Sequence, residues 1–300
     1  MRLTVVLFGL LCACALVINA VPMPQDEDVR GAFLTSRPKE KTASSTAARP
    51  THRRPKPVVA GNDTRKTSSD PKTTKTDTKT TTTVKTGRPV NAERLGLGLT
   101  LFMRDANGLA VRTDPDHVFQ KGDRVRVLLE TNTDGFLYIF NTTNDGPPVM
   151  IYPDADLDEA GNYLQSHVPF EIPTSLSPEE RLRWFAFDEA AGNERLFFVF
   201  TKEPLSGLPI EDELMALCRA SKSSCPVKPS ADIWAKVQAQ SKQPLQTNTD
   251  TQAGQTQTTT EQQATTRGLG LAKDDPQPSM IMMASSKTST LVTTLDLIHK

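Results

Sequence analysis

The sequence predicts a mostly β protein: an antiparallel β-sandwich of the immunoglobulin-like kind, with a small helical insertion and a long disordered N-terminal tail. Short apolar runs recur between residues 94 and 208, and turn signals separate them about every ten residues. No helical pattern lies between these runs, which argues against a parallel α/β sheet. The 300-residue chain is only 37% hydrophobic and 6% aromatic. Much of its length therefore cannot bury a core, which excludes a compact 300-residue enzyme and a polytopic membrane protein.

Residues 1–20 are typical of a secretory signal peptide. Arg2 precedes an almost wholly apolar run that ends at Ile18, and a small-residue cleavage site follows, with cleavage expected after Ala20. The run is shorter than the roughly 20 residues that a membrane span needs. In a competing interpretation, the motif LCAC approximates a bacterial lipobox that would lead to lipidation of Cys14. We expect an exported, periplasmic or cell-envelope protein that associates with a membrane only if it is lipidated.

Residues 21–93 form a basic segment rich in Thr, Lys and Pro. It contains 15 Lys and Arg against 8 Asp and Glu, whereas residues 94–226 contain 12 against 21. A segment with so few large apolar residues cannot offset the entropy of ordering, roughly 1–2 kcal/mol per residue, and we expect disorder. We favour a solvated spacer that lifts the domain off the membrane or wall; attraction to anionic envelope polymers is the alternative. No nucleic acid partner is expected.

The first predicted strands alternate apolar and polar residues. Residues 97–103 carry Leu, Leu, Leu and Met at every second position, and Asn107-Gly108 then predicts a hairpin turn. The runs VRVLLET (125–131) and FLYIF (136–140) flank Asp134-Gly135, which predicts a second hairpin. The turn signal NDG at 144–146 precedes a strand in residues 147–153.

Three more strands are predicted at residues 169–172, 184–187 and 194–201. The last, ERLFFVFT, is the most apolar and should lie centrally, buried on both faces. Residues 209–241 are a helical insertion with helices at 209–221 and 231–240. A Gln/Thr-rich linker is expected at 242–266. Residues 267–300 should supply C-terminal strands (280–283 and 290–299) that dock on the sandwich and close an edge, the last strand pairing with the first.

Two cysteines remain after cleavage at Ala20. Cys218 and Cys225 are an even pair in an oxidising compartment, and a disulfide between them closes a short, serine-containing loop. Two unrelated thiols, with Cys218 packed on a helix face, are the alternative.

Four short patterns recur at characteristic spacing in the predicted β region. These are Phe119 with Gly122-Asp123, Asn132 with Asp134-Gly135-Phe136-Leu137-Tyr138, Tyr152-Pro153, and Gly192 with Glu194 and Leu196. On these patterns, residues 94–205 and the C-terminal strands resemble the exported bacterial domain-of-unknown-function family numbered 4384. The family carries no assigned reaction, so the resemblance implies architecture and export more than activity. The residues themselves indicate structural roles: turns at the glycines, and tyrosine rings packed with their hydroxyls in water.

No catalytic set is evident. The chain has neither GxSxG nor SxxK, and its four histidines (His52, His117, His167 and His299) lie in the tail, in or beside loops, or at the terminus. We therefore predict a protein that is not an enzyme and has no cofactor.

One acidic pattern suggests calcium. Asp154, Asp156 and Asp158 alternate, but Glu159 stands where the loop needs Gly, and Gln165 replaces the bidentate Glu. We favour a solvated loop and predict no metal site.

The leading functional prediction is a non-enzymatic cell-envelope protein whose loops or edge strand bind another envelope protein or polymer. The alternatives are an accessory or sensor domain that regulates a partner enzyme, and a calcium-dependent binding module.

Overall fold

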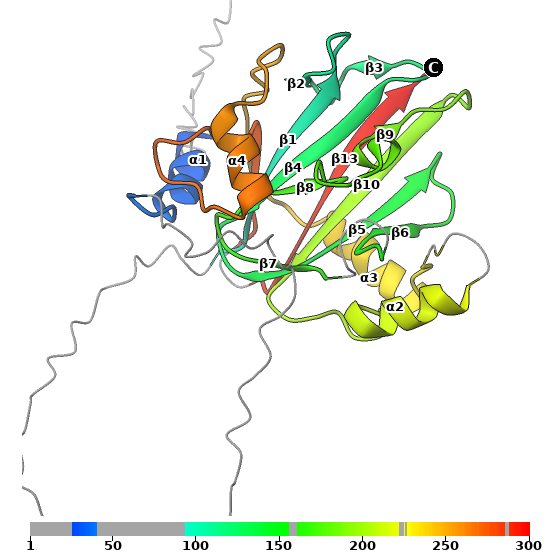
Figure 1. Cartoon of the computed structure of the whole chain (residues 1–300). Coiled ribbons are helices and arrows are strands. Elements are labelled where there is room, and N and C mark those ends of the chain that lie inside the picture. Colours follow the sequence, from blue (N-terminus) through cyan, green and yellow to red (C-terminus); the bar gives the residue numbers. More distant parts are fainter. Residues whose placement is uncertain (1–25, 41–93, 156–160, 222–224, 226, 286–287) are drawn as a thin grey trace, which may run out of the picture.

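The structure, a computed structural model, describes residues 26–40, 94–155, 161–221, 225, 227–285 and 288–300. Two β-sheets occupy its centre, and helices lie against their outer sides (Figure 1). The prediction of a mostly β chain with two sheets is confirmed. Residues 1–25, including the proposed processing sites Cys14 and Ala20, lie outside the described residues.

The first sheet, called the β1 sheet below, is antiparallel throughout. Its main order is β11 (Gln246–Thr249), β12 (Met280–Met283), β1 (Gly96–Arg104), β4 (Arg124–Thr131) and β8 (Phe170–Ile172). Two short strands extend it: β2 (Ala110–Arg112) pairs with β1, and β9 (Phe185–Ala186) pairs with β4. A 3-10 helix, η2 (Glu180–Arg183), precedes β9. The hairpin between β1 and β2 turns at Gly108, as predicted, with a φ of 83°.

The second sheet, called the β10 sheet, has the order β3 (Val118–Phe119), β13 (Thr290–His299), β10 (Gly192–Thr201), β5 (Gly135–Thr143) and β6 (Val149–Tyr152). β7 (Tyr163–Leu164) pairs with β5. The short β3–β13 pair is parallel, so this sheet is mixed. β10 lies between β13 and β5, and its last six residues are buried. The prediction of a central, buried strand here is confirmed.

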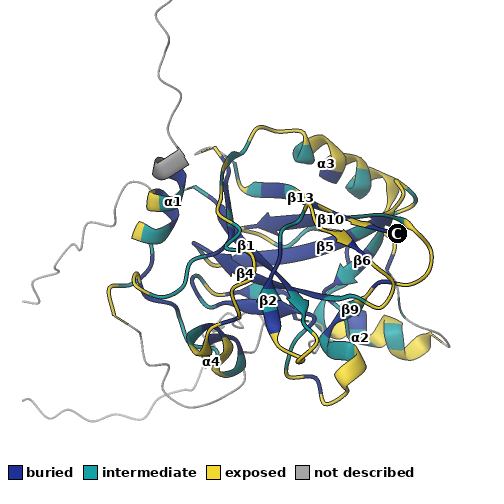
Figure 2. Ribbon diagram, turned by 90° about the horizontal axis from the view of Figure 1, so that it is seen from above, coloured by how far each residue is buried: buried dark blue, intermediate teal, exposed yellow. Residues whose placement is uncertain are grey.

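The facing sides of the two sheets share one hydrophobic core. Alternate residues of β1 and β4 meet alternate residues of β5, β10 and β13. Examples are Leu97 and Leu99 from one sheet and Phe198 and Phe200 from the other, each 1% exposed or less. In Figure 2 the strands are almost continuously buried, whereas the outer sides of the helices are exposed.

The predicted hairpin at Asp134-Gly135 is wrong. β4 pairs with β1, β8 and β9, and β5 pairs with β10, β6 and β7, so the chain crosses between sheets here. Gly135 is instead required by close approach, because a Cβ at this position would lie 2.5 Å from the backbone oxygen of Thr201. Asp134 accepts hydrogen bonds from the Ser166 amide (2.8 Å) and the Tyr163 hydroxyl (3.1 Å), which ties the crossing to the segment around β7.

The N-terminal tail is not disordered throughout its predicted length. Helix α1 (Asp26–Thr35) packs Val29, Ala32 and Phe33 against Ile281 and Met283 of β12. A ten-residue helix is marginal alone, but its apolar residues at i, i+3 and i+4 form one face that the β1 sheet buries. The prediction weighed the average composition of residues 21–93 and missed this face. Residues 41–93 lie outside the described part of the chain.

Two glycines of β1 explain how closely the α1 segment approaches. The core-facing leucines of LGLGL alternate with Gly96 and Gly98, which face α1. A Cβ on Gly96 would lie 2.9 Å from the Phe33 ring, and one on Gly98 would lie 2.8 Å from Cβ of Pro278. The alternation predicted a strand with one face in solvent, but both faces of this strand are covered.

The expected linker at 242–266 is also wrong. It contains β11, which pairs with β12, and helix α4 (Thr259–Arg267). α4 begins with a capping box between Thr258 and Glu261 and ends at Gly268, whose φ is 64°. The segment has few large apolar residues, but polar contacts hold it: Glu261, 1% exposed, pairs with Arg112 at 2.6 Å.

The C-terminal strands are integral to both sheets. β12 lies between β11 and β1, and β13 lies between β3 and β10, so they neither form a hairpin nor close an edge. The expected pairing of the first and last strands is wrong, because β1 pairs with β12 rather than β13.

Helices α2 (Glu211–Ala220) and α3 (Ala231–Ser241) lie where helices were predicted and cover the outer face of the β10 sheet (Figure 1). Leu214 of α2 and Val237 of α3 pack in one cluster with outward residues of β5 and β10 such as Tyr138. Cys218 of α2 forms a disulfide with Cys225. The disulfide joins the end of α2 to the segment that leads to α3.

Candidate functional site

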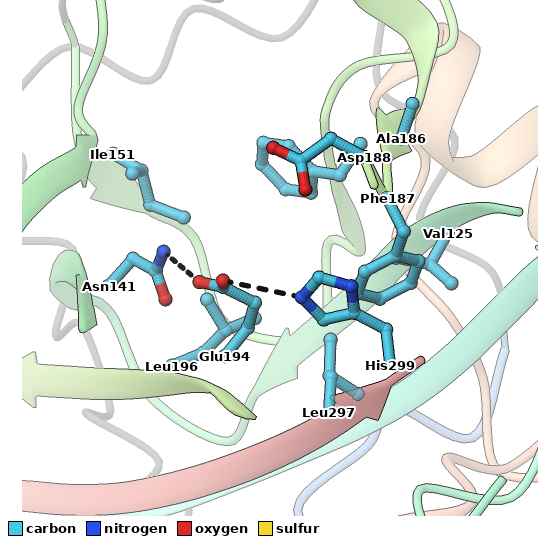
Figure 3. Close-up of a pocket in the computed structure, with 11 residues that line it drawn as sticks. Val125, Asn141, Ile151, Ala186, Phe187, Asp188, Glu194, Leu196, Leu297 and His299 are labelled. Atoms are coloured by element: carbon cyan, nitrogen blue, oxygen red, sulfur yellow. Dashed lines mark hydrogen bonds and ion pairs between the residues drawn. The ribbon is translucent and has the colours of Figure 1, made fainter. Parts of the chain in front are cut away.

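A cavity of about 190 Å³ lies between the two sheets, at the end of the core near the C-terminus. β4 and β9 contribute Val125 and Phe185 from one sheet. From the other sheet, β5, β6, β10 and β13 contribute both apolar and polar side chains. The remaining lining residues are Asn141, Ile151, Ala186, Phe187, Asp188, Glu194, Leu196, Leu297 and His299 (Figure 3).

The strand pattern explains why polar groups lie here. Side chains two residues apart share a face, and the inward rows of β5, β10 and β13 each end at the cavity with a polar residue. Asn141 follows Ile139 in β5, Glu194 precedes Leu196 in β10, and His299 follows Leu297 in β13. The cavity is thus the place where a hydrophobic core changes into a polar site.

The three polar side chains form a cluster around Glu194. Oε2 of Glu194 accepts hydrogen bonds from Nδ2 of Asn141 (2.6 Å) and Oγ1 of Thr143 (2.9 Å). Oε1 lies 3.7 Å from Nε2 of His299, too far for a hydrogen bond (Figure 3). The carboxylate is therefore fixed by two donors through one oxygen, and its other oxygen faces the imidazole.

Several buried polar atoms of this site have no hydrogen-bond partner among the described residues. They are both ring nitrogens of His299, which is 3% exposed, and Oδ1 of Asn141. The His299 ring lies against Phe187, with centroids 5.0 Å apart, and Phe187 stacks on Phe119 at 4.7 Å. Packing against aromatic rings thus holds the imidazole in place but gives its nitrogens no hydrogen bond. Because buried polar groups are normally hydrogen-bonded, such atoms beside a cavity mark a site that a ligand can complete.

The cavity favours positive charge. Glu194 and Asp188 line it, whereas no Lys or Arg side chain does. The lining also lacks Ser, Cys and Lys, the side chains most often used as nucleophiles. The remaining surface is apolar and aromatic, as in most small-molecule sites.

A second polar cluster holds the α1 segment on the β1 sheet. The fully buried Arg37 guanidinium binds Glu130 through Nε (2.8 Å) and Nη2 (2.6 Å), and donates to three carbonyls, those of Ala272, Asp275 and Pro276. Nδ1 of His167 lies 2.8 Å from Glu130 Oε1, and because an ionised carboxylate only accepts, the imidazole is the donor.

Glu130 stays ionised despite its burial. Burial raises the pKa of Glu130, but the hydrogen bonds from His167 and Arg37 and their charges outweigh it and hold this pKa below its ordinary value. Nε2 of His167 also contacts the Ser36 hydroxyl at 2.9 Å. The cluster is saturated with protein partners, so it is a docking contact for residues 36–37 rather than a ligand site.

The residues singled out from the sequence lie in separate places. Cys218 and Cys225 are joined, away from the cavity. Asp154 follows β6, but Asp156 and Asp158 lie outside the described residues, and so does His52. In the part of the chain that the structure describes, no three His, Cys, Asp or Glu side chains are grouped to hold a metal ion. Of the described histidines, only His299 lines the cavity.

Most of the residues that carry the family resemblance have structural roles. Asn132 joins the start of β1 through the Gly96 amide (2.7 Å) and the Arg94 carbonyl (2.8 Å). The expectation that Tyr138 keeps its hydroxyl in water is wrong: the residue is fully buried, and the hydroxyl accepts a hydrogen bond from the Leu205 amide (2.9 Å). Burial raises the pKa of Tyr138. Glu194 is the exception, because it lies in the cavity.

Sequence reasoning missed His299 and Asn141 as site residues. His299 was set aside as terminal, and Asn141 directly follows the apolar run at 136–140. A signal for both residues was available in the sequence. Each stands at the end of a period-two apolar pattern, where a polar residue replaces the expected apolar one.

Residues 118–204 match the family model described as Domain of unknown function (DUF4384). The match confirms the family resemblance inferred from the sequence over residues 118–204. The matched region runs from β3 through β10 and includes Asn141, Asp188 and Glu194, but not His299. No curated protein matches the chain. No solved structure matches it. Among the described residues, no helix has the length and apolar character that crossing a membrane requires.

Proposed function

We propose that this chain is a non-enzymatic, exported cell-envelope protein that binds an envelope component in the cavity between its two sheets. The observation that supports this most is the buried His299 beside Glu194 and Asn141, because neither ring nitrogen has a hydrogen-bond partner among the described residues. Polar atoms left without partners at the end of a well-packed core are costly unless a ligand satisfies them. The sequence-based expectation placed binding on loops or an edge strand; the cavity offers a more defined site.

Binding fits the lining better than catalysis does. The described lining offers two carboxylates and an imidazole but no Ser, Cys or Lys side chain, and packing against Phe187 holds the imidazole in place. Fixed acceptors and an apolar wall orient a ligand, which is what a recognition site needs.

We propose that the two sheets form an immunoglobulin-like sandwich. Strands β13, β10, β5 and β6 follow the order G-F-C-C′ of such domains, and β1, β4 and β8 follow A-B-E. The crossing from β4 to β5 then corresponds to the B–C connection between sheets. β12 and β11 extend the β1 sheet beyond the strand that corresponds to A.

Export and the form of the mature chain belong to the same proposal. Intact mass of the native protein, purified from an envelope fraction, measures both. We expect a chain that begins at Val21 and carries one disulfide, and an acylated chain that begins at Cys14 would indicate a lipid anchor instead. The unprocessed precursor, recovered from cytosol, would contradict export.

The binding proposal is tested by nuclear magnetic resonance on the purified protein. Soluble fragments from digested envelope polymers are added, and the backbone amides of Glu194, Leu196 and Leu297 are followed. We expect saturable shifts at these positions. Absence of shifts, or turnover of ester, peptide or glycan substrates that Glu194→Gln abolishes, would overturn the proposal.

A further inference from the structure

We infer that the cavity recognises a primary ammonium group at the end of an alkyl chain, as in a lysine-type side chain. This inference rests on the proposed function and names the chemistry of its ligand. It follows from three features of the site: the balance of donors and acceptors, the spacing of the acceptors, and the negative charge and apolar wall of the cavity.

The site presents acceptors rather than donors. Oε1 of Glu194 and Oδ1 of Asn141 can only accept, and Nε2 of His299 accepts in the tautomer that carries its proton on Nδ1. The donors of Asn141 and Thr143 are already directed at Oε2 of Glu194. An ammonium has three donors and no acceptor, so it complements this set.

The spacing of Glu194 and His299 fits a bridging cation. Oε1 and Nε2 are 3.7 Å apart, too far for a direct hydrogen bond. One nitrogen can contact both atoms at about 2.8 Å, the length of a charge-assisted hydrogen bond. The ammonium would thereby give a hydrogen-bond partner to Nε2 of His299, a buried nitrogen that has none among the described residues.

The charge and shape of the cavity support the same ligand. Glu194 carries the charge inside the cavity, exposed Asp188 adds a second negative charge, and no basic side chain other than His299 lines the space. Val125, Leu196 and Leu297 provide an apolar wall for methylene groups. A carboxylate or phosphate ligand would meet two negative charges, with His299 as the one basic side chain of the described lining.

The probes are a matched pair: Nα-acetyl-lysine methylamide and its norleucine analogue, which has the same backbone and a butyl side chain without the ammonium. Each is titrated into the purified protein while the amides of Leu196 and Leu297 are followed. We expect saturable shifts with the lysine probe and at least about tenfold weaker binding of the norleucine probe.

Charge variants test the role of Glu194. Glu194→Gln keeps the size and an acceptor but removes the charge, and we expect a loss of affinity of about 10- to 100-fold. Glu189→Gln is the matched control, since that side chain is 77% exposed, pairs with Lys121 and does not line the cavity. Its affinity should be unchanged. Asp188→Asn, at an exposed position, should weaken binding two- to fivefold and provides a test if Glu194→Gln does not fold.

The outcomes separate this inference from the proposed function. Equal binding of both probes, or equal effects of Glu194→Gln and Glu189→Gln, overturns ammonium recognition. Shifts of Leu196 and Leu297 with envelope fragments but not with the lysine probe also overturn it, while the binding function stands. If neither fragments nor probes shift these amides, both proposals fail.

Discussion

The buried pair of Arg37 and Glu130 should decide whether helix α1 stays on the body of the protein. Arg37→Ala removes five hydrogen bonds and leaves the buried carboxylate of Glu130 with a hydrogen bond to His167. Removing one partner of a buried ion pair costs about 3–5 kcal/mol. Detachment of α1 can limit this cost, because Glu130 would then regain contact with water.

Hydrogen exchange measures this detachment directly. For Arg37→Ala we expect protection of the amides in residues 29–37 to fall by about 100-fold or more, which corresponds to about 3 kcal/mol. Amides of β10 should keep their protection if α1 opens locally. If the loss is global instead, the melting temperature should fall by roughly 6–20 °C.

Two variants serve as controls for Arg37→Ala. Lys39→Ala removes the same charge from an exposed position of the same segment and should leave protection unchanged. The double variant Arg37→Met/Glu130→Leu removes both charges, so it should disturb α1 less than Arg37→Ala alone. Equal protection in Arg37→Ala and Lys39→Ala would refute the reasoning, because the pair would then contribute nothing to docking.

Three further predictions follow from the same contacts. Gly98→Val places side-chain atoms against Pro278 and should lower the melting temperature by several degrees. Gly31→Ala is the control, because no atom lies within 4 Å of its new Cβ, and it should not lower the melting temperature. Equal melting temperatures of the two variants would count against close packing at Gly98. The pKa of Glu130 is lowered in the folded state, so ionised Glu130 stabilises the fold. Its contribution to the free energy of unfolding is complete above the ordinary carboxyl pKa, about 4.3, and is lost as pH falls through the lower folded-state pKa. When the free energy of unfolding is measured against pH, Glu130→Gln should make its decrease at acidic pH less steep. An unchanged decrease would contradict the lowered pKa of Glu130. Reduction of Cys218–Cys225 should remove about 2 kcal/mol of stability in the chain-entropy model; an unchanged denaturation midpoint, with reduction verified by mass, would refute that figure.

Docking of α1 changes the expected role of the N-terminal segment. The segment was predicted to be a spacer that lifts the domain away from a membrane or wall. Because Arg37 is held in the β1 sheet, only the residues before α1 can separate the body from anything attached near Cys14 or Val21. A chain spans at most about 3.3–3.6 Å per residue, so such an attachment would keep the domain close to the surface.

Local patterns in the sequence were sufficient for most of the strands, though not for β3, β7 or β11, and for two helices. The alternation at residues 97–103 and the apolar run at 194–201 identify β1 and β10, and the acidic first turn after residue 209 identifies α2. Signals for α4 were also present, since Thr258, Glu261 and Gly268 form its capping box and end. They were overlooked because the segment has few large apolar residues.

Tertiary structure decided the partners of each strand and the composition of the site. A period of two shows which residues share a face, but it cannot show which strand lies next to them, so the crossing at Gly135 was taken for a hairpin. Glu194 was noticed only as part of a motif, and His299 only as a terminal residue. They meet because β13 pairs with β10 across about a hundred residues of sequence, a contact that no local pattern encodes. Similarly, Arg37 acquires its role from Glu130, because the free energy of a buried charge depends on partners distant in the chain.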